Sequence, residues 1–233
     1  MLTFTPWEAA AGSPPLGTDA LHLWCIQTGP AGADPGTLWP LICCAEQARA
    51  SRLATRTLQD RYVRAHGGLR LILGIYLNQS PQTIVFTKSE QGKPALLPAP
   101  AGSPPPLQFN LTGSHDLALL AISQDYPVGV DCEFIRPCRE LLGIARRMFS
   151  RQVADALEST PEADRLDAFY AAWTALEAQV KADGQGLFRP RDPSALPLTT
   201  VHCMPQPGYV AAVARHRLPP PHLWRFMEWS SAT

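Results

Sequence analysis

The sequence lacks an excess of charge of either sign, because its 233 residues carry 20 lysines and arginines and 20 aspartates and glutamates. A chain without net charge has no overall field that would draw it to nucleic acid or to a membrane, so any anion site must come from local clustering. It also lacks any apolar stretch near the ~20 residues needed to span a bilayer. Trp7 and Glu8 interrupt any apolar run of the signal-peptide kind. We therefore expect no nucleic acid partner and no membrane partner.

Paired cysteine motifs are absent as well. None of the six cysteines forms a C-x2-C pair, and the adjacent pair Cys43-Cys44 is a poor candidate for a disulfide. These absences favour a reducing, cytoplasmic setting in which the thiols are buried as small hydrophobic groups. Proline, by contrast, is abundant: its 24 residues are roughly twice the usual ~5% share. They concentrate in segments 94–106, 190–197 and 219–221, which we interpret as stiff connections.

The apolar pattern predicts strands and helices in both halves of the chain. We expect strands over 21–26, 83–87, 116–123, 128–133, 198–204 and 208–214, one or two helices over 46–76, and helical stretches over 139–158 and 162–182. Gly67-Gly68 is a candidate break in the first helical stretch, and Gly184 and Gly186 end the last one. This order predicts an α+β protein of two similar lobes that meet near residue 125, an N-terminal lobe over 1–124 and a C-terminal lobe over 125–233.

Two carboxylates, Asp131 and Glu133, lie two residues apart on the predicted strand 128–133. Alternation along a strand puts both on one side, with Cα atoms ~6.6 Å apart, and turns Cys132 to the other side. Two carboxylates this close repel each other unless a cation lies between them, and magnesium takes such oxygen ligands. The alternative is an exposed strand end with two solvated acids. Taken alone, the spacing of these two residues favours this alternative.

Trp173, Glu177 and Lys181 are spaced i, i+4, i+8 on the predicted helix 162–182, so they share one helical face. One interpretation is a surface Glu-Lys pair, worth ~0.3–0.5 kcal/mol, with Trp173 as a core residue. The other is that Glu177 is a third metal ligand or a general base, and that Lys181 is a phosphate clamp or a proton donor.

Taken together, these segments resemble the 4′-phosphopantetheinyl transferases of the larger, single-chain (Sfp-type) class, which serves peptide and polyketide synthetases. The family's G-V-D-x-E strand is matched by Gly129, Val130, Asp131 and Glu133. Its later pattern W-[TS]-x-K-E-[AS]-x-x-K-x-x-G-x-G-L is matched by Trp173, Thr174, Glu177, Ala178, Lys181, Gly184, Gly186 and Leu187. Upstream, Gly92-Lys93-Pro94 matches its G-K-P, and Phe109-Asn110-Leu111 opens its F-N-x-S-H-S-G-D element. The resemblance covers roughly residues 50 to 215.

The resemblance implies a reaction. Such enzymes transfer the phosphopantetheine arm of coenzyme A (CoA) to a serine of an apo acyl or peptidyl carrier protein and release adenosine 3′,5′-bisphosphate. By position, Asp131, Glu133 and Glu177 would hold Mg²⁺ at the pyrophosphate, where it neutralises the charge of the leaving group. Glu177 is also implied as the base for the serine hydroxyl, and Lys181 as the group that stabilises or protonates the leaving phosphate. The family's two lobes form a pseudo-dimer, so we expect a monomer with its active site between them.

The resemblance also places the CoA contacts. Lys93 and Arg70 are implied as phosphate ligands, with Arg61 and Arg56 as further candidates, since cationic groups suit phosphate oxygens. For most of these arginines the alternative is ordinary solvated surface. Thr112 and His115, from the element that begins at Phe109, are two more candidates for the CoA site.

Two positions depart from the family pattern. Gly113 stands where the phosphate-contacting histidine belongs, and His115 follows two places later, on the same face of an extended segment. His115 either reaches the phosphate from there or is a loop histidine. Leu176 replaces the lysine before Glu177, which predicts weaker CoA binding or turnover. These departures motivate an alternative function, a non-catalytic relative that binds CoA or a carrier protein without transferring the arm. The sequence leaves open which carrier is served and whether Mg²⁺ or Mn²⁺ is preferred.

Overall fold

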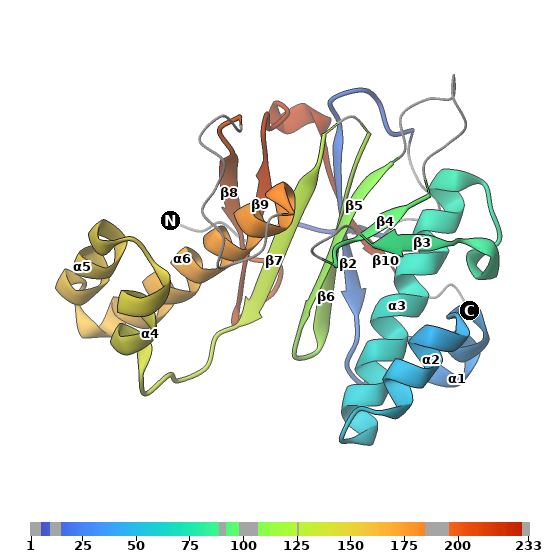
Figure 1. The fold of residues 1–233 in the computed structure, drawn as a ribbon, viewed down its shortest axis with the longest axis horizontal. Coiled ribbons are helices and arrows are strands. Elements are labelled where there is room, and N and C mark those ends of the chain that lie inside the picture. The colour runs from blue at the N-terminus through green and yellow to red at the C-terminus, as the bar shows by residue number, and fades with distance from the viewer. Residues whose placement is uncertain are drawn as a thin grey trace.

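Helices and strands follow one another largely as the apolar pattern predicts. The computed structural model describes residues 6–9, 15–88, 92–97, 107–124, 126–184 and 196–229, and Figure 1 shows their arrangement. The strands are β1 (Glu8–Ala9), β2 (Leu21–Gln27), β3 (Phe86–Lys88), β4 (Pro94–Leu96), β5 (Gln108–Ser114), β6 (Leu117–Ser123), β7 (Val128–Phe134), β8 (Thr199–Cys203), β9 (Tyr209–Arg215) and β10 (Trp224–Trp229). The α-helices are α1 (Pro35–Leu38), α2 (Cys44–Ser51), α3 (Arg56–Leu77), α4 (Leu141–Met148), α5 (Arg151–Ser159) and α6 (Glu162–Asp183), and short 3₁₀ turns cover Trp39–Leu41, Pro81–Thr83 and Pro221–Leu223.

The first sheet has the strand order β1-β10-β2-β6-β5. Its strand β6 is buried along its whole length, as a continuous apolar run predicts. Side chains alternate along β2, so Trp24 and Ile26 face α3 and pack with Leu69, Ile72 and Leu73 of that helix. The intervening residues of β2 face the opposite way, toward the second sheet.

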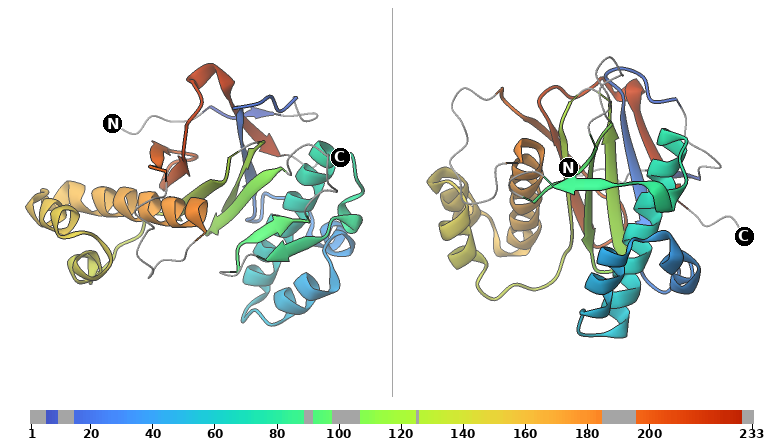
Figure 2. Two further views of the ribbon diagram at one scale, coloured as in Figure 1. Left: turned by 45° about the horizontal axis from the view of Figure 1, so that its top comes forward. Right: turned by 45° about the vertical axis from the view of Figure 1, so that its right-hand side comes forward.

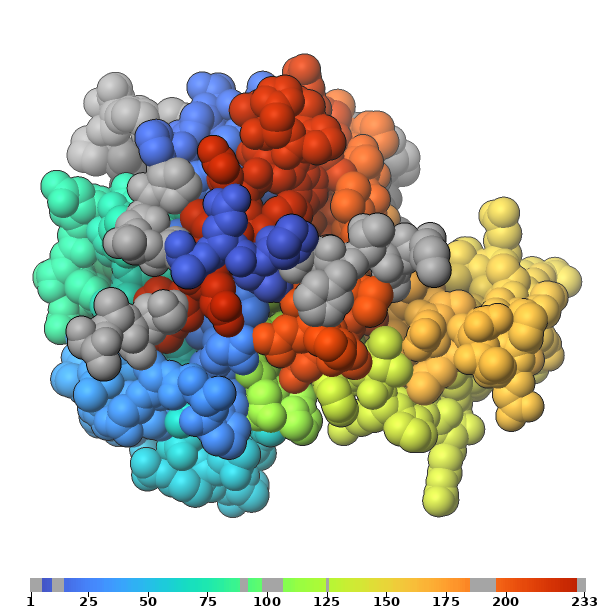
Figure 3. Space-filling view, turned by 180° about the vertical axis from the view of Figure 1, so that it is seen from behind, coloured from blue at the N-terminus to red at the C-terminus, as the bar shows by residue number. Residues whose placement is uncertain are grey.

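The second sheet has the antiparallel order β7-β9-β8. On one face, Val128 and Val130 of β7 share a core with Leu21 and Leu23 of the first sheet. On the other face, α6 packs through small residues, which are Ala178 and Ala182 on the helix and Ala212 and Ala214 on β9. The molecule is therefore layered in the order α3, first sheet, second sheet, α6 (Figure 2). α4, α5 and the first half of α6 form a helical cluster that projects to one side (Figure 3).

The predicted break at Gly67-Gly68 is wrong, because α3 runs through both residues without interruption. Both glycines instead allow close packing: a Cβ on Gly67 would stand 2.8 Å from Leu38 Cβ, and one on Gly68 would stand 3.0 Å from Ile26 Cγ2. The helical region is interrupted earlier, between α2 and α3, where the side chain of Thr55 caps the start of α3.

Three further element predictions need correction. The predicted helix 139–158 is two helices, because Ser150 caps a new helix, α5. The predicted strand 83–87 shortens to β3, and no strand was expected where β10 forms. β10 pairs in parallel with β2, so the end of the chain joins the first sheet.

The mixed helices and sheets confirm the α+β class, whereas the division at residue 125 stays a prediction. No helix in the described part of the chain combines the length and apolarity needed to cross a membrane.

Candidate active site

Direct contact between α6 and β7 positions the acidic residues. Gly129 of β7 permits this contact, because a Cβ there would collide with the backbone carbonyl of Ala178 and the amide of Ala182. The strand period then turns Asp131 to the α6 side of β7, while Cys132 lies in the core between the sheets. The carboxylates of β7 and the polar residues of α6 therefore meet on one face of the second sheet.

Asp131 is buried, at 3% exposure, and two side chains hold it. Its Oδ1 accepts hydrogen bonds from Lys181 Nζ at 2.5 Å and from Thr112 Oγ1 at 3.0 Å. Burial raises the pKa of Asp131, and the positive charge of Lys181 and the two hydrogen bonds oppose that rise. The other oxygen, Oδ2, is buried without a hydrogen-bond partner among the described residues. Asp131 thus keeps one acceptor for a further ligand.

Glu133 and Glu177 lie within electrostatic reach of Asp131. Glu133 Oε2 accepts a hydrogen bond from Ser114 Oγ at 2.7 Å. Burial raises the pKa of Glu133, and the hydrogen bond from Ser114 opposes that rise. The negative charge of Asp131 raises the pKa of Glu133 further. Burial likewise raises the pKa of Glu177, where the charge of Lys181 opposes the rise and Asp131 adds to it. Repulsion among carboxylates of this kind is what a bound cation relieves.

The three carboxylates are of the ligand type that a hard divalent cation takes. Magnesium prefers oxygen ligands from one or two carboxylates, with water and phosphate completing its shell. Asp131 Oδ2, which has no hydrogen-bond partner among the described residues, is a buried acceptor of that kind. As the side chains lie, no three acidic, histidine or cysteine groups in the described residues are arranged to hold one ion. The ammonium of Lys181 instead contacts Asp131. Asp131, Glu133 and Glu177 remain the residues that could hold a metal.

Polar side chains of β5 join the two sheets at this site. Asn110 Oδ1 accepts from the Val130 amide at 2.8 Å, and the next two residues on the same face of β5 are Thr112 and Ser114. Thr112 donates its hydrogen bond to Asp131, and Ser114 donates its hydrogen bond to Glu133. The edge strands β5 and β7 are therefore connected through side chains rather than through a backbone ladder, and the acids lie along this seam.

A cavity of about 400 Å³ opens beside the seam, and its lining includes the predicted residues Arg61, Thr112 and His115. His115 has a left-handed backbone (φ 51) and stacks on Phe134, with ring centroids 4.7 Å apart. His115 Nδ1 lies 3.0 Å from Asp116 Oδ2, and Arg61 Nε donates to Asp116 Oδ1 at 2.8 Å. The structure thus brings three of the six predicted CoA residues together.

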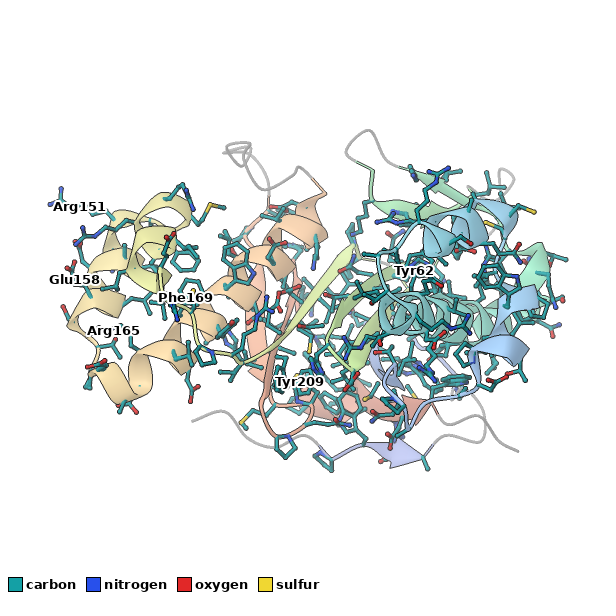
Figure 4. All side chains as sticks on the ribbon, turned by 90° about the horizontal axis from the view of Figure 1, so that it is seen from below. Tyr62, Arg151, Glu158, Arg165, Phe169 and Tyr209 are labelled. Carbon is teal, nitrogen blue, oxygen red and sulfur yellow. The ribbon has the colours of Figure 1, made fainter. Side chains whose placement is uncertain are left out.

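A second cavity, of about 370 Å³, shares Arg49, Tyr62 and His66 with the first. The rings of Tyr62, labelled in Figure 4, and His66 are stacked with centroids 4.0 Å apart, and the guanidinium of Arg49 lies 5.8 Å from the Tyr62 ring. Sequence reasoning missed Arg49, because α2 carries no motif and only its packing beside α3 brings this arginine to the cavities. Two neighbouring cavities that share arginine and aromatic lining residues suit a nucleotide with phosphates.

Arg56 and Arg70 have other partners in the described structure. Arg56 is 78% exposed and pairs with Asp60 at 2.9 Å. Arg70 is 1% exposed, pairs with Glu46 at 2.7 Å and donates to two backbone carbonyls of the segment after α3. Burial alone would raise the pKa of Glu46, but hydrogen bonds from His66, Arg70 and the Cys43 amide lower it to about 2. Arg70 therefore joins α3 to α2 and to the following segment.

Lys93 also bonds to backbone groups. Its Nζ donates to the carbonyl oxygens of Val128 and Lys181. The predicted family residues Gly186 and Leu187 lie outside the described residues.

Clustered carboxylates, a lysine and arginine-lined cavities are the kinds of group that enzymes use to transfer a phosphate-bearing group. The family model of the 4′-phosphopantetheinyl transferase superfamily matches residues 127–232. The 4′-phosphopantetheinyl transferase HetI of Nostoc sp. is 32% identical over 210 residues, which cover 84% of this chain and 88% of HetI.

Other relatives match over shorter spans. A putative 4′-phosphopantetheinyl transferase of Synechocystis sp. is 34% identical over 147 residues, which are 63% of this chain and 58% of that protein. The 4′-phosphopantetheinyl transferase ffp of Bacillus subtilis is 35% identical over 109 residues, 47% of this chain and 45% of its own. The chain belongs to the 4′-phosphopantetheinyl transferase family, and it is a transferase.

Proposed function

We propose that this protein transfers the 4′-phosphopantetheine arm of CoA to a serine of an apo acyl or peptidyl carrier protein. The observation that carries the proposal is the convergence of Asp131, Glu133, Glu177 and Lys181 beside a cavity lined by Arg61 and His115. In this reaction the serine Oγ bonds to the phosphorus that bears the pantetheine arm. The bond from that phosphorus to the bridging oxygen breaks, and adenosine 3′,5′-bisphosphate leaves.

We further propose that the two sheets with their long helices are the two lobes of a pseudo-dimer in one monomeric chain.

Each residue has a distinct role in this proposal. Glu177 takes the serine proton, and its raised pKa favours a carboxylate that accepts a proton near neutral pH. Lys181 stabilises the leaving phosphate oxygen by hydrogen bonding or proton donation. Asp131, Glu133 and Glu177 would hold Mg²⁺, which when bound supplies positive charge to the pyrophosphate.

We place the CoA nucleotide in these two neighbouring cavities. Arg49 and Arg61 provide guanidinium groups for its phosphates. Tyr62 and His66 provide a flat surface between the cavities on which a base can lie. This placement puts the pantetheine end toward the seam between β5 and β7, where the carboxylates are.

We place the carrier protein at a groove of about 520 Å³ that begins at Glu133 and continues past Arg136 and Arg139 to Phe169 and Trp173. Trp173 stacks on Phe169, with centroids 6.2 Å apart, so the groove has an apolar floor and a basic rim. An acidic helix with apolar residues fits such a surface, and the groove ends at the carboxylates where the serine must arrive.

Charge reversal tests this docking site. Arg136→Glu combined with Arg139→Glu should raise KM for an apo acyl carrier protein about tenfold or more, because opposite charges become like charges. The dissociation constant for CoA should be unchanged. Arg151→Glu is the matched control, since Arg151 is 95% exposed and lies at the outer end of the helical cluster (Figure 4). Equal KM values for the double variant and the control would rule out this groove.

The reaction itself is tested by intact mass spectrometry of apo carrier proteins incubated with the protein, CoA and Mg²⁺. A phosphopantetheine-sized mass gain that EDTA abolishes supports the proposal. Asp131→Asn and Glu177→Gln, which keep the side-chain shapes, should each abolish that gain while CoA still binds. CoA binding without modification of acyl or peptidyl carriers would favour the non-catalytic alternative that Gly113 and Leu176 suggest.

A further inference from the structure

Lys93 connects the two elements that carry the proposed catalytic groups. It directly precedes β4, and its Nζ reaches the second half of the chain. There it donates to the carbonyl of Val128 at 3.1 Å and to that of Lys181 at 2.6 Å. Val128 begins β7, which carries Asp131 three residues later, and Lys181 lies in the last turn of α6. One ammonium group thus bonds to the backbone of both elements.

The bond to Lys181 caps the end of α6. The last four carbonyls of a helix have no partner inside it, and the carbonyl of Lys181 is one of them, because α6 ends at Asp183 with Gly184 as its left-handed cap. A cation at this end also interacts favourably with the helix dipole. Burial lowers the pKa of Lys93 to about 8, against the charge of Asp183, so the ammonium is still mostly protonated at pH 7.

The contact between α6 and β7 shows where such a link acts. Where α6 crosses β7, Gly129 presents no side chain, and the facing helix residues are Ala178 and Ala182. A contact between glycine and alanine surfaces brings the backbones close, but at the crossing itself few side chains interlock. Elsewhere α6 is held to β8 by hydrogen bonds of Gln179 with Thr200 and of the Ala171 carbonyl with His202. Hydrogen bonds from Lys93 to both α6 and β7 fix the position of α6 at the crossing.

The use of lysine at this position is itself informative. The chain has three lysines, at 88, 93 and 181, and its other basic residues are arginines. A lysine ammonium is a compact charge on a slender stem that fits between two carbonyls, whereas a guanidinium is a planar fork suited to carboxylates and phosphates.

We propose that Lys93 is a positioning residue, which holds the end of α6 against the start of β7 and thereby aligns Lys181 with Asp131. It acts through the backbone of α6 and not as a ligand of the CoA phosphates, the role that the family resemblance implied. This inference rests on the proposed function of the same site.

Two variants separate positioning from phosphate binding. Lys93→Met keeps the stem and removes the charge and the donors, and Lys93→Arg keeps the charge. In Lys93→Met we expect hydrogen exchange of the last turn of α6 to speed up about tenfold or more, and kcat for carrier modification to fall about tenfold or more. The dissociation constant for CoA, measured by calorimetry, should stay within about twofold. Lys93→Arg should recover part of kcat and part of the exchange protection.

Lys88→Met is the matched control, because Lys88 is an exposed lysine on the partner strand of the same hairpin and should leave exchange in α6 unchanged. A tenfold weaker CoA affinity of Lys93→Met with unchanged exchange in α6 would overturn the inference. Unchanged kcat and unchanged exchange would do so too. If the wild-type protein modifies no carrier, the proposed function fails, and exchange and CoA affinity still decide the role of Lys93. Should Lys93→Met not fold, Lys93→Arg carries the same readouts.

Discussion

Gly113 is the residue at which one added side chain has room to act. It lines, from β5, the cavity that also contains Arg61 and His115, its backbone is not left-handed, and a Cβ there would meet no atom closer than 3.7 Å. Gly113→His would add an imidazole donor for a CoA phosphate. We expect kcat/KM for CoA to rise about tenfold, which corresponds to ~1.4 kcal/mol. Steady-state kinetics with a carrier protein would measure it.

Gly113→Ala is the control, because it fills the same space without a donor and should leave kcat/KM near the wild-type value. A loss of CoA affinity in the histidine variant, with an intact fold, would mean that the phosphates do not pass this position. It would also favour His115 as the histidine of the site.

His22 gives the protein an acid-sensitive interaction. It is 2% exposed, and its Nδ1 lies 2.6 Å from the Tyr76 hydroxyl, which in turn accepts a bond from Trp24 Nε1. The hydroxyl therefore donates to a neutral Nδ1. Burial, with the charge of Arg225, lowers the pKa of His22 to about 4. A histidine in the unfolded chain titrates at ~6.5. The contribution of neutral His22 to the free energy of unfolding is therefore complete above pH ~6.5, and roughly 3 kcal/mol of it is lost as the pH falls toward 4.

Urea unfolding at several pH values tests this. His22→Asn, whose side-chain oxygen can accept the Tyr76 bond, should flatten the fall in unfolding free energy between pH 6.5 and 4. His222→Asn replaces an exposed histidine and should leave the slope as it is in the wild type. Equal slopes in the wild type and in His22→Asn would contradict the assignment of a neutral buried histidine.

The roles of single residues were only partly predictable from the sequence. The spacing of Asp131 and Glu133 on a strand determines that they share a face, and this holds in the structure because side-chain alternation is local. The role of Arg70 at a phosphate stays a prediction, and the described structure pairs Arg70 with Glu46, which lies 24 residues away on another helix. Partners at that distance depend on how helices pack, which one sequence does not encode in a readable pattern.

At the scale of elements, the contact between α6 and β7 sets the geometry of the site. This close contact requires glycine at position 129. Gly129→Ala would drive a methyl group into the helix backbone, which overpacks a site with no flexible side chain to move. We expect a loss of about 3 kcal/mol or more in the free energy of unfolding. Gly143→Ala is the control, because Gly143 is an exposed residue inside α4 with open space around it. That variant should gain about 0.5–1 kcal/mol. Similar stabilities of the two variants, measured in urea, would contradict this account.

Element boundaries show where local patterns lose their predictive value. Gly67-Gly68 suggests a helix break on propensity alone, yet both residues lie inside α3, because Leu38 and Ile26 need the space that their missing side chains leave. β10 escaped prediction for a different reason: it is a short segment with only modest alternation, and its pairing with β2 joins residues about 200 positions apart.

At the scale of the whole molecule, the two sheets meet along β5 and β7 with polar side chains between the edge strands. Asn110, Thr112 and Ser114 serve this seam and also hold the carboxylates of β7. The same hydrogen bonds therefore stabilise the union of the sheets and orient the site. Ligands that bind at the seam should accordingly stabilise the entire fold.

Thermal unfolding would measure this linkage. A ligand that binds only the native state at 100 times its dissociation constant adds ~2.7 kcal/mol, and for a chain of this size each kcal/mol shifts Tm by about 2–4 °C. We expect CoA with Mg²⁺ to raise Tm by about 5–10 °C, and EDTA to remove part of that shift. In Asp131→Asn the shift from CoA alone should remain and the part due to Mg²⁺ should vanish, because the variant removes a buried carboxylate whose Oδ2 has no other described partner. An Mg²⁺-dependent shift of equal size in Asp131→Asn would place the metal elsewhere. A shift that is absent with both ligands would mean that the seam does not bind CoA.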